Sequence, residues 1–365
     1  MSGLYIHIPF CRQKCRYCDF PSFAAQEELI DAYLAALQQE AALYPNVQFN
    51  TLYIGGGTPS LLTEKQLSYL LDIIAWQFGG LSSFEECTLE ANPESLTAEK
   101  LNLLKDAGLS RLSLGLQSFN DDVLKKIGRI HRVSTFLKAY ELARKAGFEN
   151  INVDLIGGLP GEKEEDFIKG VERLVSLDPT HISVYGLQVE EGTPFAKDGV
   201  SADEDVLRRE LEKVHEVLGQ VGFNHYEISN FARPGYESKH NMNYWQNGSY
   251  LGLGSAAATY LNGERRYNVL DVKEYLRRME FGLSPVESAE SLTGKAKEGE
   301  SIMLGLRMLG GIKLSEEQSK MFSSEIEELC ARGLVSRQGD LLKLTFEGMF
   351  LANQAFMAFV GPFDA

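Results

Sequence analysis

The residues best suited to chemistry are three cysteines that lie close together near the start of the sequence. Cys11, Cys15 and Cys18 have the spacing C-x3-C-x2-C, and neither Cys87 nor Cys330 has a cysteine nearby. Thiolates at such tight spacings bind iron–sulfur clusters, whereas a structural zinc site usually takes four ligands. Three ligands leave one metal position open for a small molecule. The pattern predicts an iron–sulfur cluster; the alternatives are a three-ligand zinc site and cysteines grouped by chance.

A glycine run lies at the end of the second apolar segment of the chain. It comprises Gly55, Gly56 and Gly57, followed by Thr58 and Pro59. Because glycines have no side chain, their backbone N–H and C=O groups can approach a bound molecule closely. By itself such a run is more often a simple turn. Its place in this chain favours a ligand contact.

Polar side chains end, or lie within, the next four apolar segments. They are Glu90, Gln117, Asp154, Tyr185 and Gln188. In a barrel of parallel strands, polar residues at the carboxyl ends of the strands are typical site residues. One alone is as easily a loop cap, but five successive strand ends that are polar or glycine-rich are not expected by accident. Arg129 can hold a carboxylate through two hydrogen bonds; the alternative is a solvated surface arginine.

Six short apolar segments alternate with segments of helical periodicity in the first half of the chain. They cover residues 4–8, 51–54, 86–89, 111–116, 150–156 and 181–187. Between them, apolar residues recur at i, i+3 and i+4, as in 29–44 and 63–76. Thr63 and Thr97 precede acidic first turns, and Ser134 opens a helix. Six strand–helix units in series predict an α/β fold: an open, partial (β/α)6 TIM-like barrel, two units short of closure.

The pattern changes after about Gly199. A long helix is expected over 203–221, followed by a segment rich in aromatic residues, Gly and Asn. From about Ser291, the order helix, short helix, helix and hairpin indicates a small winged-helix-like module. We therefore expect a barrel over 1–200, an α+β extension over 201–288 and the C-terminal module over 289–365. Its candidate recognition segment, 325–333, is acidic, which favours a structural or lid role over DNA binding.

The composition excludes several classes of protein. The formal net charge of the 365 residues is −15, which disfavours nucleic acid as a partner. No stretch approaches the ~20 apolar residues of a membrane span, which leaves peripheral membrane contact only. The first residues lack the basic and small-residue features of a signal peptide, and an odd number of cysteines argues against a disulfide framework. We expect a cytoplasmic protein.

The cysteine loop after the first strand, with Tyr17 before the last cysteine, resembles that of the radical S-adenosylmethionine (SAM) superfamily. The resemblance implies that Cys11, Cys15 and Cys18 hold three irons of a [4Fe–4S] cluster. SAM would chelate the fourth iron through its amino and carboxylate groups. One electron from the reduced cluster would then cleave SAM to a 5′-deoxyadenosyl radical. The protein would orient these cofactors and exclude water.

Six segments together resemble the oxygen-independent coproporphyrinogen III oxidase-like group: YIHIPFC, GGGTPS, LEANPE, GLQSFN, IGRIH and DLIGGLPG. The resemblance covers nearly the whole chain. It assigns SAM contacts to Tyr5, Gly56, Gly57, Thr58, Glu90, Gln117, Arg129 and Asp154. The true oxidase carries a fourth cysteine where this chain has Phe20, and an N-terminal extension before its first strand. Both departures disfavour porphyrinogen oxidation.

Residues 240–245, HNMNYW, resemble an H-N-x-x-Y-W motif of the haem chaperones in this group. A neutral imidazole is a natural ligand of haem iron, and Tyr244 and Trp245 can line an apolar macrocycle. The alternative is that His240 and Asn241 satisfy buried backbone while the aromatic residues pack in the core. The resemblance favours haem contact by His240, with His7 and His225 as lesser candidates.

The resemblance implies a haem chaperone with a [4Fe–4S] cluster, exchangeable SAM and bound haem. Its partners would be acceptor haemoproteins, such as respiratory chain components, and a reductant for the cluster. The rival hypothesis is a radical SAM enzyme, either the porphyrinogen oxidase or a methyltransferase that uses two SAM molecules. Whether the chain is an enzyme stays open at this point.

Overall fold

The computed structural model describes residues 1–45 and 47–361. Six parallel strands form the centre of its main sheet and pair in chain order. They are β1 (Ser2–Ile8), β4 (Thr51–Gly56), β5 (Glu86–Ala91), β6 (Arg111–Gln117), β7 (Asn150–Gly157) and β8 (His181–Gly186). All six apolar segments therefore form the expected strands, and the open, TIM-like α/β barrel is confirmed.

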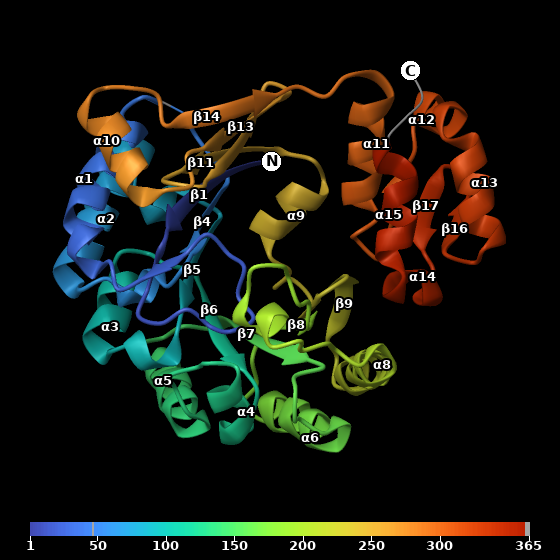
Figure 1. Cartoon of the computed structure of the whole chain (residues 1–365), viewed down its shortest axis with the longest axis horizontal. Helices are drawn as coiled ribbons and strands as arrows, with labels where there is room; N and C mark the ends of the chain where they lie inside the picture. Colours follow the sequence, from blue (N-terminus) through green and yellow to red (C-terminus); the bar gives the residue numbers. More distant parts are fainter. Residues whose placement is uncertain (46, 362–365) are drawn as a thin grey trace.

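Helices cover the outer face of this curved sheet (Figure 1). They are α1 (Ile30–Ala41), α2 (Glu64–Phe78), α3 (Ala98–Asp106), α4 (Asp121–Lys126), α5 (Val133–Lys145) and α6 (Glu164–Val175). Thr63 caps α2 and Thr97 caps α3, each accepting a backbone N–H bond three residues on. Helix α5 begins at Val133, so Ser134 lies inside the first turn rather than opening the helix.

Side chains on β1 alternate between the two faces of the sheet, as the pleat of a strand requires. Leu4, Ile6 and Ile8 are fully buried in the apolar core. Tyr5 and His7 project to the opposite face and line the barrel interior. The pattern of β1 therefore separates the residues that stabilise the barrel from those that can meet a ligand.

The main sheet extends beyond the barrel at both edges. Helices α7 (Pro194–Lys197) and α8 (Glu204–Gln220) lead to β9 (Asn224–Glu227) and β10 (Asn230–Ala232), which pair antiparallel beyond β8. At the other edge, β11 (Ser249–Leu253) joins β1 in parallel. Beyond it come the antiparallel strands β12 (Ala258–Leu261), β13 (Glu264–Asn268) and β14 (Val286–Glu290). The extension thus supplies strands to both ends of one twelve-stranded sheet.

The C-terminal elements gather beside the barrel (Figure 1). They are α11 (Gly294–Gly305), β15 (Ile312–Lys313), α12 (Glu316–Met321), α13 (Ser323–Ala331), β16 (Val335–Gln338), β17 (Leu341–Leu344), α14 (Phe346–Phe350) and α15 (Ala352–Val360). Their order of helix, strand, two helices and hairpin is that of a winged helix. They enclose a second apolar core, which includes Ile302, Phe322 and Phe359. The division of the chain at residues 200 and 288 stays a prediction.

Backbone hydrogen bonds join this C-terminal module to the last strand of the main sheet. The Ile228 amide donates to the Arg307 carbonyl (3.2 Å), and the Leu309 amide donates to the Tyr226 carbonyl (3.0 Å). The Arg307 guanidinium also lies over the Trp245 ring, 4.2 Å from its centroid. The module is thus attached both to the edge of the sheet and to α9 (Lys239–Trp245). Among the described residues, no helix combines the length and apolar composition needed to cross a bilayer.

One buried carboxylate ties α1 to the extension. The Glu40 side chain accepts hydrogen bonds from the Tyr275 hydroxyl (2.7 Å), the Gly254 amide (2.7 Å) and the Asn268 amide nitrogen (2.6 Å). Tyr275 belongs to α10 (Val272–Glu280), which packs beside α1. Burial raises the pKa of Glu40 to about 7, because loss of hydration outweighs the three donors.

The raised pKa of Glu40 predicts a pH-dependent stability. Between pH 4.5 and 7 the folded chain holds a proton on Glu40 that the unfolded chain releases, so the free energy of unfolding falls as pH rises through this window. In urea titrations at pH 5 and pH 8, we expect Glu40→Gln to remove about 2–3 kcal/mol of the wild-type decrease. Tyr275→Phe is the control, because it removes one donor and keeps the carboxyl group. An equal pH dependence in wild type and Glu40→Gln would contradict the assignment.

Candidate functional site

The three clustered cysteines lie on a loop at the carboxyl end of β1. Cys11 ends the short strand β2 (Phe10–Cys11), which pairs with β3 (Phe23–Ala24). Between these strands the Cys18 amide donates to the Cys15 carbonyl (3.2 Å), and the Arg16 amide donates to the Ile127 carbonyl (3.0 Å). The loop is therefore closed by its own short strand pair and fastened to the end of α4.

Two donors from the barrel point at the cysteine sulfurs. The Thr58 hydroxyl donates to Cys11 Sγ (3.5 Å) and Arg129 Nη1 donates to Cys15 Sγ (3.7 Å). Burial raises the pKa of the Cys11 and Cys18 thiols, so the thiolates need a bound cation for compensation. Across the described residues, no three His, Cys, Asp or Glu side chains form a group able to hold one metal ion. Three thiolates on one loop match the ligand set expected for an iron–sulfur cluster.

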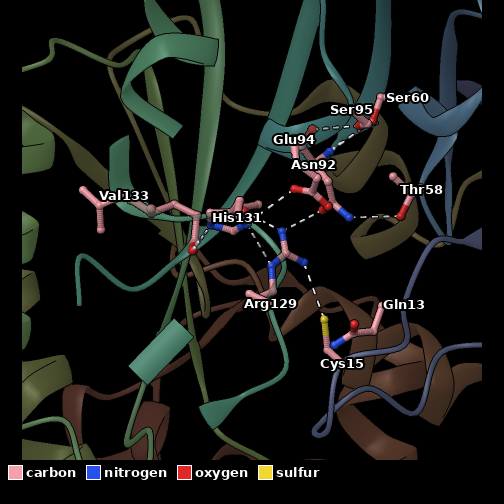
Figure 2. A network of polar contacts seen from close by, with 12 residues as sticks. Gln13, Cys15, Thr58, Ser60, Asn92, Glu94, Ser95, Arg129, His131 and Val133 are labelled. Carbon is pink, nitrogen blue, oxygen red and sulfur yellow. Dashed lines mark hydrogen bonds and ion pairs between the residues drawn. The ribbon is translucent and has the colours of Figure 1, made fainter. Parts of the chain in front are cut away.

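A polar network centred on Arg129 connects the cysteine loop to three strand ends (Figure 2). Arg129 Nη2 donates to the Asn92 side-chain oxygen and to the Gly115 carbonyl, both at 2.7 Å. Asn92 in turn donates to the Thr58 hydroxyl (3.0 Å). Arg129 is therefore not a solvated surface arginine. Asn92 was not singled out from the sequence, although it directly follows β5 in the LEANPE segment.

The glycine run brings the end of β4 against the cysteine loop. The Gly57 amide donates to the Ile8 carbonyl (2.9 Å), and the Thr58 amide donates to the Phe10 carbonyl (2.8 Å). A Cβ on Gly57 would lie 2.7 Å from the Phe10 carbonyl oxygen, and a Cβ on Gly56, at φ 110°, would lie 2.5 Å from the His7 ring. These glycines are required first by the packing of the protein itself.

Glu90 occupies the barrel interior beside the glycine run. Its carboxylate accepts hydrogen bonds from the Tyr53 hydroxyl (2.8 Å) and the Gly56 amide (3.1 Å). Burial raises the pKa of Glu90 to about 7, and the nearby Asp154 carboxylate adds to the shift. Tyr53 is a further site residue that sequence patterning missed, because an apolar strand segment gives no sign of the direction of its hydroxyl.

A short hydrogen-bonded chain leads from β1 to the cysteine loop. The Tyr5 hydroxyl lies 2.8 Å from His7 Nδ1, and His7 Nε2 lies 2.8 Å from the Pro21 carbonyl oxygen. A carbonyl only accepts, so Nε2 carries the proton and Nδ1 accepts from Tyr5. Burial lowers the pKa of His7, which agrees with a neutral ring. His7 thus positions the loop.

Gln117 and Asp154 lie on neighbouring strands. Gln117 has φ 72°, a left-handed conformation that is uncommon outside glycine and that clusters at functional sites. It lies at a bulge between β6 and β7. Asp154 accepts from the Asn152 amide nitrogen (2.8 Å) and the Ser113 hydroxyl (3.4 Å). The structure therefore places the predicted SAM residues on the barrel strands or in the loops that follow them, except Arg129, which lies between α4 and α5. Their contacts with SAM stay predictions.

His240, the expected haem ligand, is buried inside the protein. Its side chain is 1% exposed, with Nδ1 2.8 Å from the Thr51 hydroxyl and Nε2 2.9 Å from the Tyr244 hydroxyl. Its amide donates to Glu86, and Gly3 leaves room for its ring. Gly3, Thr51 and Glu86 lie at the amino ends of β1, β4 and β5, opposite the cysteine loop, whereas Tyr244 belongs to α9 itself. Both ring nitrogens are engaged and the ring is enclosed, so His240 holds α9 in the barrel, and its contact with haem stays a prediction.

The end of α9 reaches a cavity of about 560 Å³ between the barrel, the extension and α11. Tyr5, His7, Gly56 and Glu90 line it on the barrel side, and Phe20 and Pro21 line it on the cysteine loop. Tyr244, Trp245, Tyr250, Tyr267 and Met303 supply much of the remaining wall. The volume and the aromatic lining suit a flat, largely apolar ligand.

Comparisons with known proteins agree with this geometry. Residues 5–174 match the Radical SAM superfamily. The haem chaperone HemW of Bacillus subtilis (strain 168) is 39% identical over an alignment of 377 positions. The alignment covers 99% of this chain and all of that protein. HemW of Mycobacterium tuberculosis (strain H37Rv) is 35% identical over an alignment of 371 positions, which covers 98% of this chain and 95% of that protein.

Among solved structures, the radical SAM enzyme coproporphyrinogen III oxidase (HemN) from Escherichia coli superposes with a TM-score of 0.86. The match covers 98% of this chain and 89% of that protein at 24% sequence identity, which establishes a common fold alone. The full-length similarity to the curated relatives is closer and extends through the C-terminal module. The chain therefore belongs to the HemW family of the radical SAM superfamily.

Proposed function

We propose that this protein is a haem chaperone, which binds haem and transfers it to acceptor haemoproteins. The observation that carries the proposal is the cavity that joins Tyr5, Gly56 and Glu90, all predicted SAM contacts, to the aromatic end of α9. Curated relatives of the same length are named haem chaperones, which supports this choice. Haem would lie in the cavity against Trp245 and Tyr250, rather than on His240.

The radical SAM fold implies two further cofactors. Cys11, Cys15 and Cys18 would hold a [4Fe–4S] cluster, with Thr58 and Arg129 donating hydrogen bonds to the sulfurs. SAM would bind beside the cluster, near Tyr5, Gly56 and Glu90. Bound together, these groups supply one-electron chemistry. The chain's own part is to orient them, to exclude water and to keep His7 neutral against the loop.

The partners follow from this role. Acceptor haemoproteins would include respiratory chain components, and a cellular reductant would supply electrons to the cluster. We place the protein in the cytoplasm, with peripheral contact to the membrane where such acceptors lie. The net charge of −15 continues to disfavour nucleic acid, in spite of the winged-helix order of the C-terminal module.

Porphyrinogen oxidation is the weaker candidate. The similarity to the solved oxidase establishes the fold alone. Phe20 stands where the oxidase carries its fourth cysteine, and its ring is 64% exposed at the cavity wall. An apolar side chain there suits contact with a macrocycle. No observation in the described residues favours a methyltransferase.

A haem titration tests the chaperone proposal. With the cluster reconstituted under anaerobic conditions, we expect stoichiometric haem binding and a Soret band, followed by transfer to an added apo-haemoprotein. Bovine serum albumin carrying haem is the control for passive release. Absence of binding, or transfer no faster than from albumin, would remove the proposal.

The cluster assignment predicts a selective effect of cysteine variants. We expect Cys15→Ser to lose the cluster, measured as iron content and charge-transfer absorbance, because one of three thiolate ligands is removed. Cys330→Ser is the matched control, since Cys330 is an exposed thiol on α13. Full iron content in Cys15→Ser would show that the cluster has other ligands.

Two variants on α9 separate the cavity from His240 as the haem site. We expect His240→Gln to keep the haem affinity and Soret position, because His240 is buried behind Tyr244 and glutamine preserves hydrogen-bonding groups there. Trp245→Leu should weaken haem binding about tenfold through loss of aromatic contact. A lost or shifted Soret band in His240→Gln alone would restore His240 as the ligand.

A further inference from the structure

The cavity contains one strong cation. Among the described residues that line it, Arg265 on β13 is the only lysine or arginine. Glu300, from α11, lies beside it, and Glu90 lies toward the barrel. Arg265 therefore favours an anionic group of a ligand at its end of the cavity. The Glu90 carboxylate disfavours an anionic group at the barrel end.

A carboxylate of the protein itself now occupies that position. Arg265 Nη1 lies 2.6 Å from Glu300 Oε1, and both side chains are nearly enclosed, at 15% and 14% exposed. A second carboxylate, Glu290 on β14, lies 3.7 Å away, is 49% exposed and does not line the cavity. Arg265 also lies over the Tyr260 ring, which holds its guanidinium in place.

The Arg265–Glu300 pair also holds a wall of the cavity. Glu300, Met303 and Leu304 share α11 and form the face that this helix presents to the cavity. Arg265 belongs to the extension, so the ion pair links the main sheet directly to the C-terminal module. A ligand group that takes the place of the Glu300 carboxylate beside Arg265 breaks this ion pair, which is one of the contacts that keep the wall in place.

We propose that a carboxylate of the bound tetrapyrrole displaces Glu300 from Arg265, so that ligand binding releases α11 from β13. The inference rests on the proposed haem-binding function and deepens it. Haem is flat and apolar except for two carboxylates on one edge. Burying such a carboxylate without a cation is costly, whereas exchanging one carboxylate for another on a guanidinium preserves the charge-assisted hydrogen bonds.

The exchange of carboxylates on Arg265 fixes the orientation of the bound tetrapyrrole. It also accounts for the release of the tetrapyrrole. The carboxylate edge faces Arg265, and the opposite edge faces Tyr5 and Glu90 near the SAM site. Glu300 competes for Arg265 throughout, so its return expels the carboxylate and closes the wall. This property suits a chaperone, because an internal competitor weakens the hold on the ligand and so favours its transfer to an acceptor.

Ferric haem and haem dimethyl ester, which lacks the free carboxylates, test the exchange on the cluster-reconstituted full chain. We expect Glu300→Gln to bind haem about tenfold more tightly than wild type, because the competitor is removed, and to bind the ester unchanged. Arg265→Gln should bind haem about tenfold more weakly and lose the preference for haem over the ester. Glu287→Gln, the matched control at an exposed carboxylate of β14 outside the cavity, should behave as wild type.

Hydrogen exchange of the α11 amides supplies a second measurement that does not depend on affinity. We expect haem, and not the ester, to accelerate exchange in α11. Equal wild-type affinities for haem and ester, an unchanged haem affinity in Glu300→Gln, or equal exchange with both ligands would each overturn the proposal. If neither ligand binds to wild type, the haem-binding function itself fails, which is a distinct result.

Discussion

The site depends on the buried hydrogen bonds of Arg129. One guanidinium contacts the Asn92 side chain after β5, the Gly115 carbonyl on β6 and the Cys15 sulfur on the metal loop. Between β2 and β3 the cysteine loop contains no helix or strand, so neighbouring segments must fix its geometry. Arg129 suits this task because its planar donors point in several fixed directions at once. The barrel therefore fixes the position of the cysteine loop through Arg129.

Local patterns predicted what local physics determines. The six apolar strands and the caps at Thr63 and Thr97 each depend on residues a few positions apart, and both were confirmed in the structure. Contacts between distant segments could not be predicted in this way. Asn92 joins Thr58 to Arg129 across three strand ends, and β11 adds to β1 from about 250 residues later in the chain. No periodicity reports such pairings.

For the motif around His240, the residue types suggest a ligand site, whereas the position of the histidine indicates a packing role. Its histidine and aromatic residues suggested a ligand site, and the aromatic residues do reach the cavity. The histidine lies at the other end of the same helix, where Thr51, Tyr244 and Glu86 hold it between strand ends. The first turn of α9 thus packs against the amino ends of the barrel strands, and its last residues line the cavity. Sequence alone could not distinguish the two ends.

The attachment of the C-terminal module to β9 has a consequence for the chain as a whole. An outer strand of a large sheet presents unpaired amide and carbonyl groups, which invite pairing with another molecule. Here the backbone of the segment after α11 satisfies groups at Tyr226 and Ile228, next to the end of β9. Because these bonds lie beyond α11, the helix can move away from β13 while they remain intact. A carrier whose wall opens when its ligand binds thereby keeps this part of its own sheet edge covered while it is loaded.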